Sequence, residues 1–340
     1  MKIINTRILA IESSCDDTSC AVLLNERVLS NVTAGQDVHK LYGGVVPELA
    51  SRDHQKNILP VVHAALEQAC VSLAELDAVA VTRGPGLMGS LLVGLSFAKS
   101  LSLALNKPLI EVNHMQAHVL AHFIESDKQK SPGFPFLCLT VSGGHTQLVL
   151  VKARLEFEVL GQSIDDAVGE AFDKAAKILG LPYPGGPVID QLASKGSPTR
   201  FSFAHPKTEG YNFSFSGIKT SFLYFIQNET QKDLNFVSKN IHDICASYQH
   251  HLVQVLLKQV RRVMKDKALK HLALAGGVSA NSELRKQIQQ LGVELGTEVY
   301  LPEFQYCTDN AAMIGIAAYF KFQRSEFADL SLTPLARMPL

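Results

Sequence analysis

Short apolar runs separated by polar turns open the chain. Residues 7–14 read Arg-Ile-Leu-Ala-Ile-Glu-Ser-Ser, residues 20–24 read Cys-Ala-Val-Leu-Leu, and residues 28–33 follow the polar pair Asn25 and Glu26. Apolar runs of this length between turn residues are typical of β-strands. The pattern therefore predicts three consecutive strands that are joined by tight turns.

The same pattern returns in residues 137–151, where a strand again enters a small polar loop and a second strand leaves it. Three pairs of residues align at a constant offset of 128 positions: Leu9 with Leu137, Ser14 with Ser142, and Thr18 with Thr146. A third strand is expected near residues 157–160. Because this period is the size of a domain, the repeat predicts two lobes of one fold.

Helical and parallel-strand patterns follow in both halves. Apolar residues at helical spacing occupy 58–69 in the first half and 168–179 in the second. Strands are expected at 77–82 and 271–275, and each is followed by a glycine-rich turn and a helix. The predicted architecture is two α/β lobes, each with a three-strand meander, parallel strands, and helices on both faces.

The repeat also sets the expected domain boundaries. The first lobe is expected at 1–130 together with the C-terminal tail 325–340, and the second at 131–324 with a proline- and glycine-rich insertion at 182–217. The length of 340 residues agrees with about two domains. The arrangement resembles the actin, sugar kinase and Hsp70 superfamily, whose nucleotide lies between two ribonuclease-H-like lobes. This resemblance implies an α/β fold with a central cleft.

Composition narrows the possible classes of function. Lys and Arg total 32, as do Asp and Glu, and a formal net charge of zero excludes a histone-like nucleic-acid binder. Apolar residues make up 46%, which excludes a disordered chain. The longest apolar segment, 87–105, is interrupted by glycine, serine and Lys99, and no signal sequence is recognisable. We therefore expect no membrane span and a cytoplasmic location, which six scattered cysteines without a C-x-x-C pair also favour.

Two loops between paired strands carry candidate chemistry. Residues 142–146 read Ser-Gly-Gly-His-Thr, and backbone N–H groups there can approach an anion closely because two residues lack Cβ. An ordinary glycine-rich hairpin is the alternative. The repeat partner, residues 13–18, holds adjacent Asp16 and Asp17. Two such carboxylates are costly unless they are solvated, and beside a phosphate they would need a metal or a reacting proton between them.

A pair of histidines has the spacing of metal ligands. His114 and His118 are four positions apart, so both side chains would share one face of a helix. A zinc protease would have Glu directly after the first histidine as its general base, but Met115 stands there. Asp309, just before an apolar helix, is a candidate third ligand. The alternatives are a polar helix face for the pair and a helix-capping charge for Asp309.

Further polar and glycine-rich positions in the second half could contact a nucleotide. Asp166, Glu170 and Asp173 are spaced to share one helix face, which is unfavourable unless they meet a cation or ligand hydroxyls. Residues 184–187 predict a rigid Pro-Gly-Gly-Pro turn. Residues 276–281 read Gly-Gly-Val-Ser-Ala-Asn, and an adenine could stack over the glycine pair. The alternative for both glycine pairs is an ordinary turn that binds no ligand.

Nine motifs carry a resemblance to one family over nearly the whole chain. They occur in order at residues 11–18, 43–52, 113–118, 141–146, 169–174, 183–187, 213–217, 275–281 and 307–310. Together they resemble the tRNA adenosine threonylcarbamoyltransferase family of the bacterial TsaD type, which was formerly labelled a glycoprotease because of its paired histidines.

The resemblance implies a reaction and a site. The family transfers a threonylcarbamoyl group from threonylcarbamoyl-AMP to the N6 amine of the adenosine 3′ of the tRNA anticodon, forming t6A and releasing AMP. Asp16 would lie near the reacting amine, and His114, His118 and Asp309 would hold one divalent metal, iron(II) or alternatively zinc. The residues implied to bind the activated intermediate are Val141, Ser142, Gly143, Gly144, His145, Asp173, Gly186, Asp190 and Asn281. A paralogous subunit and a small P-loop ATPase are the implied partners.

Two other classes of protein stay open on the residues alone. The histidine pair could belong to a metalloendopeptidase, and the superfamily also contains non-catalytic ATP-binding scaffolds. A basic cluster adds a separate question, and its members are Arg261, Arg262, Lys265, Lys267 and Lys270. The cluster is interpreted either as a solvated helix C-terminus or as contacts for the phosphates of tRNA.

Overall fold

The computed structural model describes residues 5–128 and 130–340. The chain divides into two compact units. Unit 1 comprises residues 1–132, 153–156 and 302–340, and unit 2 comprises residues 133–152 and 157–301. Each unit contains one five-stranded sheet with helices packed on it, which confirms the expected α/β fold built from two similar lobes.

The sheet of unit 1 has the strand order β3-β2-β1-β4-β5. The strands are β1 (Arg7–Glu12), β2 (Thr18–Leu24), β3 (Arg27–Ala34), β4 (Ala78–Gly84) and β5 (Leu109–Asn113). Strand β1 pairs antiparallel with β2 and parallel with β4, which in turn pairs parallel with β5. Because β1, β4 and β5 run in one direction, the loops that follow them leave the same edge of the sheet, where ligands of such sheets bind.

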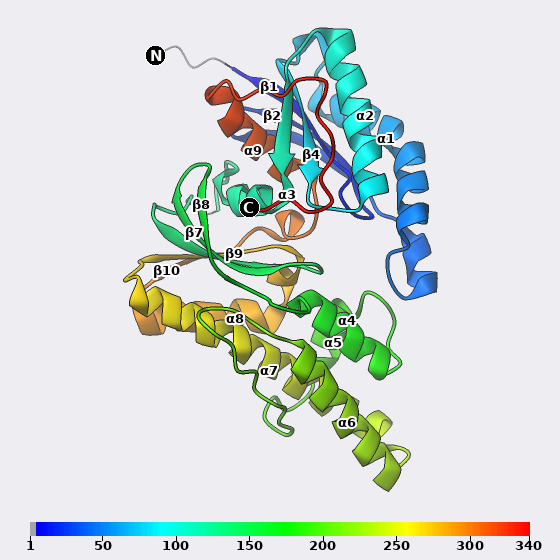
Figure 1. Cartoon of the computed structure of the whole chain (residues 1–340), viewed down its shortest axis with the longest axis vertical. Helices are drawn as coiled ribbons and strands as arrows, with labels where there is room; N and C mark the ends of the chain where they lie inside the picture. Colours follow the sequence, from blue (N-terminus) through cyan, green and yellow to red (C-terminus); the bar gives the residue numbers. More distant parts are fainter. Residues whose placement is uncertain (1–4, 129) are drawn as a thin grey trace. The chain divides into compact units, whose positions relative to one another are not determined.

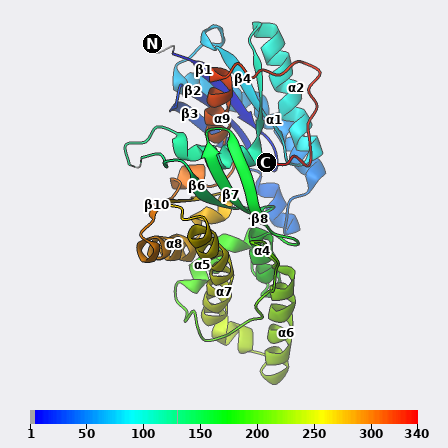
Figure 2. The same cartoon turned by 60° about the vertical axis from the view of Figure 1, so that its left-hand side comes forward.

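Helices cover both faces of this sheet. The α-helices of unit 1 are α1 (Pro47–Ala69), α2 (Met88–Leu105), α3 (His114–Leu120) and α9 (Ala311–Gln323), and the short 3-10 helices are η1 (Asp37–Tyr42), η2 (Leu73–Glu75), η3 (Ala121–Phe123) and η5 (Phe304–Tyr306). Helices α1 and α2 lie on one face and α9 on the other (Figure 1 and Figure 2). Left-handed residues, Cys70 and Asn106, follow the last turns of α1 and α2 and end these helices.

Helix α9 corrects the expected domain boundary. The sequence analysis placed residues 302–324 in the second lobe, but the structure places them in unit 1. The physical reason is burial: α9 is apolar almost all round, as a fully enclosed helix must be, and it packs on β1, β2 and α3. The chain therefore returns to its first lobe before the C-terminal tail begins.

Unit 2 repeats the topology of unit 1. Its sheet has the order β10-β9-β6-β7-β8. The strands are β6 (Phe136–Val141), β7 (Thr146–Ala153), β8 (Glu156–Gln162), β9 (His271–Ala275) and β10 (Glu298–Tyr300). The pairing of Leu9 with Val22 in unit 1 recurs as Leu137 with Leu150, so the strand register is conserved between the halves at the same 128-position offset. The expected internal repeat is confirmed.

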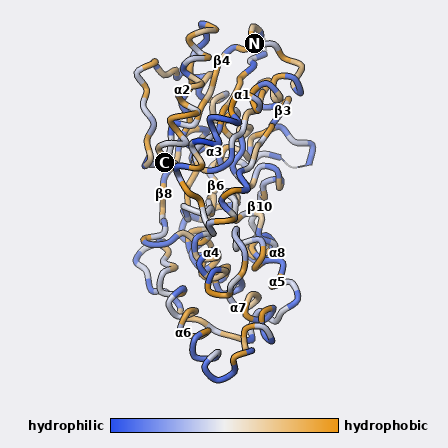
Figure 3. Tube along the Cα trace, turned by 90° about the vertical axis from the view of Figure 1, so that its right-hand side faces the viewer, coloured by the Kyte–Doolittle hydropathy of each residue, from blue (hydrophilic) through white to orange (hydrophobic). Residues whose placement is uncertain are grey.

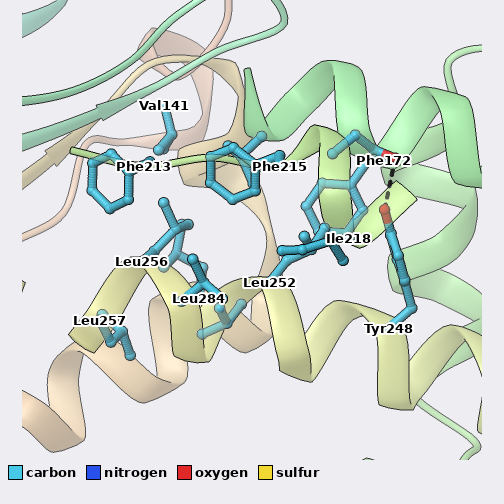
Figure 4. Packing of buried hydrophobic residues seen from close by; sticks show 14 of the residues in the cluster. Val141, Phe172, Phe213, Phe215, Ile218, Tyr248, Leu252, Leu256, Leu257 and Leu284 are labelled. Atoms are coloured by element: carbon cyan, nitrogen blue, oxygen red, sulfur yellow. Dashed lines mark hydrogen bonds between the residues drawn. The ribbon is translucent and has the colours of Figure 1, made fainter. Parts of the chain in front are cut away.

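The helices of unit 2 gather on one side of its sheet (Figure 2). They are α4 (Val168–Ile178), α5 (Gly185–Ala193), α6 (Ser216–Lys232), α7 (Phe236–Asp266), η4 (Gly277–Ala280) and α8 (Ser282–Leu295). The segment expected as an insertion, 182–217, contains α5 and is part of the core. Phe213 and Phe215 are buried between Val141 of β6 and the apolar face of α7 (Figure 4).

One helix meets the length and composition of a membrane span within the described residues. Helix α2 is 18 residues long with a mean hydropathy of 1.5, and 33% of it is buried. Core helices meet the same test, and α2 packs its Gly94 and Ala98 side against the unit. Hydrophobic positions otherwise follow strands such as β4 and β6, as the colouring of the trace shows (Figure 3).

Candidate metal centre and substrate loops

The paired histidines lie at the start of α3, directly after β5. The helix begins at His114 because the side chain of Asn113 accepts hydrogen bonds from the backbone N–H groups of Met115 and Gln116. His114 and His118 are both buried, and their rings meet edge to face with centroids 4.7 Å apart. The expected helical spacing therefore does put both imidazoles on one face.

Asp309 completes a three-residue cluster with these histidines. Its Oδ1 lies 3.3 Å from Nε2 of His114 and 3.2 Å from Nε2 of His118. The cap of α9 is the next residue, Asn310, whose side chain accepts from the N–H of Met313. Asp309 is thus not consumed by capping, and its carboxylate is free to face the histidines. Its side chain stays 26% exposed, which leaves one side of the cluster open.

Glu12 is a site residue that the sequence analysis missed. It ends β1, is fully buried, and its Oε2 lies 3.0 Å from Nδ1 of His114. The same oxygen accepts a 2.6 Å hydrogen bond from Thr82, and the other oxygen accepts from the N–H of Ser14. Glu12 thereby holds the proton of His114 on Nδ1 and leaves Nε2 directed at Asp309. The available signal was an acidic residue at the end of an otherwise apolar buried strand.

The cluster is strongly coupled electrostatically. Burial opposes charge on His114, but the carboxylates of Asp309 and Glu12 outweigh it and raise the pKa of His114 well above its usual value. Burial lowers the pKa of His118, and the positive charge of His114 adds to this effect. Burial would raise the pKa of Asp309, yet His114 and the histidine hydrogen bonds hold it well below its usual range. A charged His114 therefore links two carboxylates beside a neutral His118.

The donor set fits a divalent transition metal. The ligand atoms of His114, His118 and Asp309 all lie within 4.8 Å of one another. Metal–ligand bonds of about 2.1 Å in tetrahedral or octahedral geometry separate neighbouring ligand atoms by roughly 3.0 to 3.4 Å. The separations of 3.3 and 3.2 Å between Oδ1 of Asp309 and the Nε2 atoms of His114 and His118 fall in that interval. Two imidazoles and one carboxylate suit iron or zinc and leave positions open for other ligands.

The loop between β1 and β2 carries Asp16 and Asp17 at the same end of the sheet. His54 of α1 fixes this loop, because its Nδ1 lies 2.8 Å from the hydroxyl of Thr18 and its Nε2 lies 3.0 Å from the carbonyl of Cys15. Burial, followed by the charge of Asp16, raises the pKa of Asp17 to about 7. Asp17 is therefore not simply solvated, which was one of the alternatives that the sequence left open.

In unit 2 the loop 142–145 lies in the position that the repeat predicts. The N–H of Ser142 donates to the carbonyl of His145, which closes the loop. Two glycines from other elements allow close backbone approach. A Cβ on Gly169 would lie 2.5 Å from the carbonyl oxygen of Ser142, and a Cβ on Gly276 would lie 2.4 Å from that of Val141. No residue larger than glycine fits at either position without displacing the loop.

The expected Pro-Gly-Gly-Pro turn is the first turn of a helix. Helix α5 begins at Gly185, and Asp173 of α4 accepts hydrogen bonds from the N–H groups of Gly185 and Gly186. Burial nevertheless raises the pKa of Asp173. The prediction that Asp166, Glu170 and Asp173 lie on one helix is wrong for Asp166, which precedes α4, but two of the three acids do meet a cation. Asp166 and Glu170 each form a 2.8 Å ion pair with Lys174.

Asp190 and Asn281 are joined through one glutamine. Asp190 of α5 accepts a 2.9 Å hydrogen bond from Gln249 of α7, and Gln249 accepts a 2.8 Å bond from Asn281. Asp190 also accepts from both the N–H and the hydroxyl of Ser282. The amide oxygen of Asn281 caps α8 through the N–H of Leu284. Asn281 is thus already engaged in the fold, and the network holds α5, α7 and α8 in one arrangement.

The structure therefore groups the candidate residues within each unit. In unit 1 it brings His114, His118 and Asp309 together and places the Asp16 loop at the end of the same sheet. In unit 2 it joins Val141 and Ser142 to the glycines of neighbouring elements, Asp173 to Gly186, and Asp190 to Asn281 through Gln249.

Comparison with known families and proteins adds a second line of observation. A family model described as tRNA N6-adenosine threonylcarbamoyltransferase matches residues 27–316. A protein of that name from Christiangramia forsetii is 58% identical over 330 residues, covering 97% of each chain. One from Riemerella anatipestifer is 56% identical over 333 residues, covering 98% of each chain. One from Thermosipho africanus is 47% identical and covers 98% of this chain and 99% of its own.

Solved structures show the fold at much lower identity. Full-length HypF in its phosphate- and nucleotide-bound form matches 95% of this chain with a TM-score of 0.62 and 13% identity. HypF of T. kodakarensis matches 96% with a TM-score of 0.60 and 15% identity. This chain spans about half of those proteins, 47% and 49%. Component A of the (R)-2-hydroxyglutaryl-CoA dehydratase of Acidaminococcus fermentans matches with a TM-score of 0.51 and 16% identity. This match covers 93% of the present chain and 98% of component A.

Proposed function

This chain belongs to the tRNA N6-adenosine threonylcarbamoyltransferase family, and from that premise we propose that it transfers a threonylcarbamoyl group to the N6 amine of an adenosine in tRNA. The donor is threonylcarbamoyl-AMP, and the acceptor is the adenosine 3′ of the anticodon. The observation that carries the proposal is the match of 47 to 58% identity over nearly the whole chain, in a protein whose His114, His118 and Asp309 converge.

The proposed reaction is an acyl transfer to an amine. The N6 nitrogen bonds to the carbamoyl carbon, the bond from that carbon to the phosphate oxygen breaks, AMP leaves, and the amine gives up one proton. Because the donor is a mixed anhydride, it is already activated. The protein then needs only to bind the phosphate, orient the amine and stabilise the developing charge on the carbonyl oxygen. This requirement is met without a nucleophilic side chain.

The residues of unit 1 supply the groups for positioning and proton transfer. His114, His118 and Asp309 hold the proposed metal, which is iron(II) or alternatively zinc, and a bound divalent metal offers positive charge and open positions to ligand oxygens. Glu12 keeps His114 in the tautomer that a metal ligand needs. Asp16 accepts the proton of the amine or orients the amine, a role that is typically worth 10² to 10⁴ in rate.

The residues of unit 2 bind the donor in this proposal. The loop 142–145 presents backbone N–H groups and no Cβ atoms at Gly143 and Gly144, where the space is open. Asp173, Gly186, Asp190 and Asn281 form the remaining contacts. Asp190 and Asn281 are held in place by Gln249, so their positions are set before the donor arrives.

Partners and location remain proposals of the same kind. We propose that the chain works in the cytoplasm with a paralogous subunit and a small P-loop ATPase that produces or renews the donor-bound state. Exposed apolar side chains on α2, Met88, Leu92 and Leu103, offer a surface on which a protein partner could be buried.

The test is a reconstitution with nucleoside analysis. The purified chain is incubated with threonylcarbamoyl-AMP and a tRNA transcript, with and without candidate partners, and the digested tRNA is analysed by mass spectrometry for t6A. A variant with His114→Ala and His118→Ala is the matched control. Formation of t6A by the wild type and its loss in the variant would support the proposal, whereas cleavage of peptides without t6A would favour a metalloendopeptidase.

A further inference from the structure

A cavity of unit 2 is lined by cationic side chains. It has a volume of about 240 Å³ and lies between α7 and the segment 205–213. Lys207, Lys258 and Arg262 line it, and none of its described lining residues is Asp or Glu. A hollow lined by charges of one sign attracts ions of the opposite sign, because its low-dielectric walls focus the electric field of those charges.

Two of the three cationic side chains of this cavity have no partner among the described residues. Arg262 is the exception, because it donates to the carbonyl oxygen of Gly210 at 2.7 Å and forms an ion pair with Asp266 at 3.9 Å. Lys207 and Lys258 are both exposed, and among the described residues neither has an ion pair or hydrogen bond. Two ammonium groups without a protein partner therefore line one hollow, where both are accessible to an anion.

The rim of the cavity is held in a defined shape. Gln259 of α7 donates to the carbonyl oxygen of Asn212 at 3.0 Å, and the hydroxyl of Thr208 donates to the same oxygen at 2.7 Å. The guanidinium of Arg262 stacks over the ring of Tyr211 at 5.0 Å, and the hydroxyl of Tyr211 donates to Asp266 at 2.8 Å. The segment that carries Lys207 is thus fastened to the helix that carries Lys258.

A second hollow continues the first along α7. It has a volume of about 620 Å³ and shares Lys258 with the first cavity. Its added lining includes the side-chain amides of Gln254 and Gln287, which are hydrogen-bonded to each other, and the 2.7 Å ion pair of Arg261 with Glu294. Residues 254, 258, 261 and 262 follow helical spacing, so they form one stripe of about 12 Å on α7. This length exceeds a single phosphate.

From these features we infer that the two hollows form one groove, which binds the phosphodiester backbone of the tRNA substrate through Lys207 and Lys258. The inference rests on the proposed function for the identity of the polyanion. The chain has a formal net charge of zero, so it needs a local cationic surface to bind RNA. Lys207 and Lys258 share the first hollow, and the second hollow continues along α7, so the groove is longer than a small phosphate ester requires.

The inference also revises the sequence-based interpretation of the basic cluster. Arg261 and Arg262 are engaged within the protein, and Lys265 and Lys270 line neither hollow. The free positive charges of the groove come instead from Lys207 and Lys258, and neither residue belongs to the cluster at 261–270. Segments distant in sequence form the surface, and only the folded chain brings them together.

The test compares two double variants of the full chain that remove equal charge. Lys207→Gln with Lys258→Gln changes the groove, and Lys265→Gln with Lys270→Gln changes exposed lysines outside it. Binding of a tRNA transcript is measured by fluorescence anisotropy across 50 to 200 mM salt. For the groove variant, the slope of log K against log salt should fall by about 1.4 to 1.8, because each phosphate contact contributes about 0.7 to 0.9. The outer variant should keep the wild-type slope.

Equal slopes for the groove variant and the wild type would overturn the inference. It would also be overturned if the wild type bound inorganic phosphate through Lys258 while the groove variant bound tRNA as tightly as the wild type does. The failure of the proposed function is separate from both. Binding is measured without donor, so a groove that binds tRNA in a chain that forms no t6A would sustain the RNA site and refute the transferase. Where t6A forms, the groove variant should raise KM for tRNA and leave kcat unchanged.

Discussion

Replacing Glu12 with glutamine tests how the proposed metal centre is built. Glutamine keeps the volume and shape of the side chain but has one acceptor oxygen where glutamate has two. In the structure one oxygen of Glu12 accepts from the N–H of Ser14, and the other accepts from Thr82 and faces His114. Because the N–H of Ser14 can only donate, the amide oxygen must face it, and the NH₂ group then meets the protonated Nδ1 of His114. We therefore expect a stability loss of about 1 to 3 kcal/mol in the metal-free protein.

The effect on metal binding follows from the same contacts. Without the carboxylate, Nδ1 of His114 loses the acceptor that keeps its proton there and leaves Nε2 available to the proposed metal. Changes to such supporting partners typically lower metal affinity 10- to 100-fold, which is about 1.4 to 2.7 kcal/mol. The assay is titration of the metal-free protein with zinc against a competing chelator dye, with circular dichroism to verify the fold.

The matched control for Glu12→Gln is Asp77→Asn. Asp77 accepts a hydrogen bond from the N–H of Arg7 at 2.7 Å, at the opposite end of the same strand. Both changes remove one carboxylate charge from contacts with β1, but only Glu12 touches His114. Zinc affinities of Glu12→Gln and wild type that agree within twofold, in a folded protein, would refute the role assigned to Glu12.

Three further outcomes are expected. Nearby carboxylates raise the pKa of His114, so in the metal-free protein this residue stays protonated at pH values above about 6.5, the pKa of histidine in the unfolded chain. Zinc must displace that proton, so between the unfolded and the folded pKa the logarithm of the zinc affinity should rise by about one per pH unit. Calorimetry in buffers of different ionisation enthalpy should show one proton released per zinc ion, and an affinity that does not change with pH would contradict this. The Asp16→Asn variant should keep its fold and donor binding but lose about 10²- to 10⁴-fold in single-turnover transfer, and an unchanged rate would reduce Asp16 to a loop acid. The Gly276→Ala variant should lower the free energy of unfolding, measured by chemical denaturation, by about 1 to 3 kcal/mol, because the Cβ would lie 2.4 Å from the carbonyl oxygen of Val141 and the backbone has a φ of +88°. The Gly277→Ala variant is the control, and it should lose much less because the space there is open. Equal losses would show that the contact with Val141 is unimportant.

Local patterns in the sequence predicted most of the fold. The strand pattern of residues 7–33 and its return 128 positions later depend only on neighbouring residues, and the structure confirms both with matching registers. The His114 and His118 pair was recognisable for the same reason, since helical spacing alone puts the two side chains on one face. Each of these features, a strand or a pair of residues at helical spacing, is encoded by a few neighbouring residues.

Long-range partners could not be read from local patterns. Glu12 meets His114 across 102 positions, and nothing near either residue indicates the other. The return of residues 302–324 to unit 1 depends on which sheet an apolar helix covers, and apolarity alone does not decide that. The carbonyl of Pro339 accepts a 2.8 Å bond from Asn113, so even the tail contacts the residue that caps the histidine helix.

The central claim is that the chain couples loss of AMP from the donor to modification of one tRNA adenosine. The most direct measurement is the ratio of AMP released to t6A formed, using a tRNA transcript and the same transcript with guanosine in place of the adenosine 3′ of the anticodon. The account predicts one AMP for each t6A with the first RNA, no t6A with the second, and AMP release that falls to the uncatalysed level there. Equal, rapid AMP release with both RNAs, without t6A in either, would contradict it.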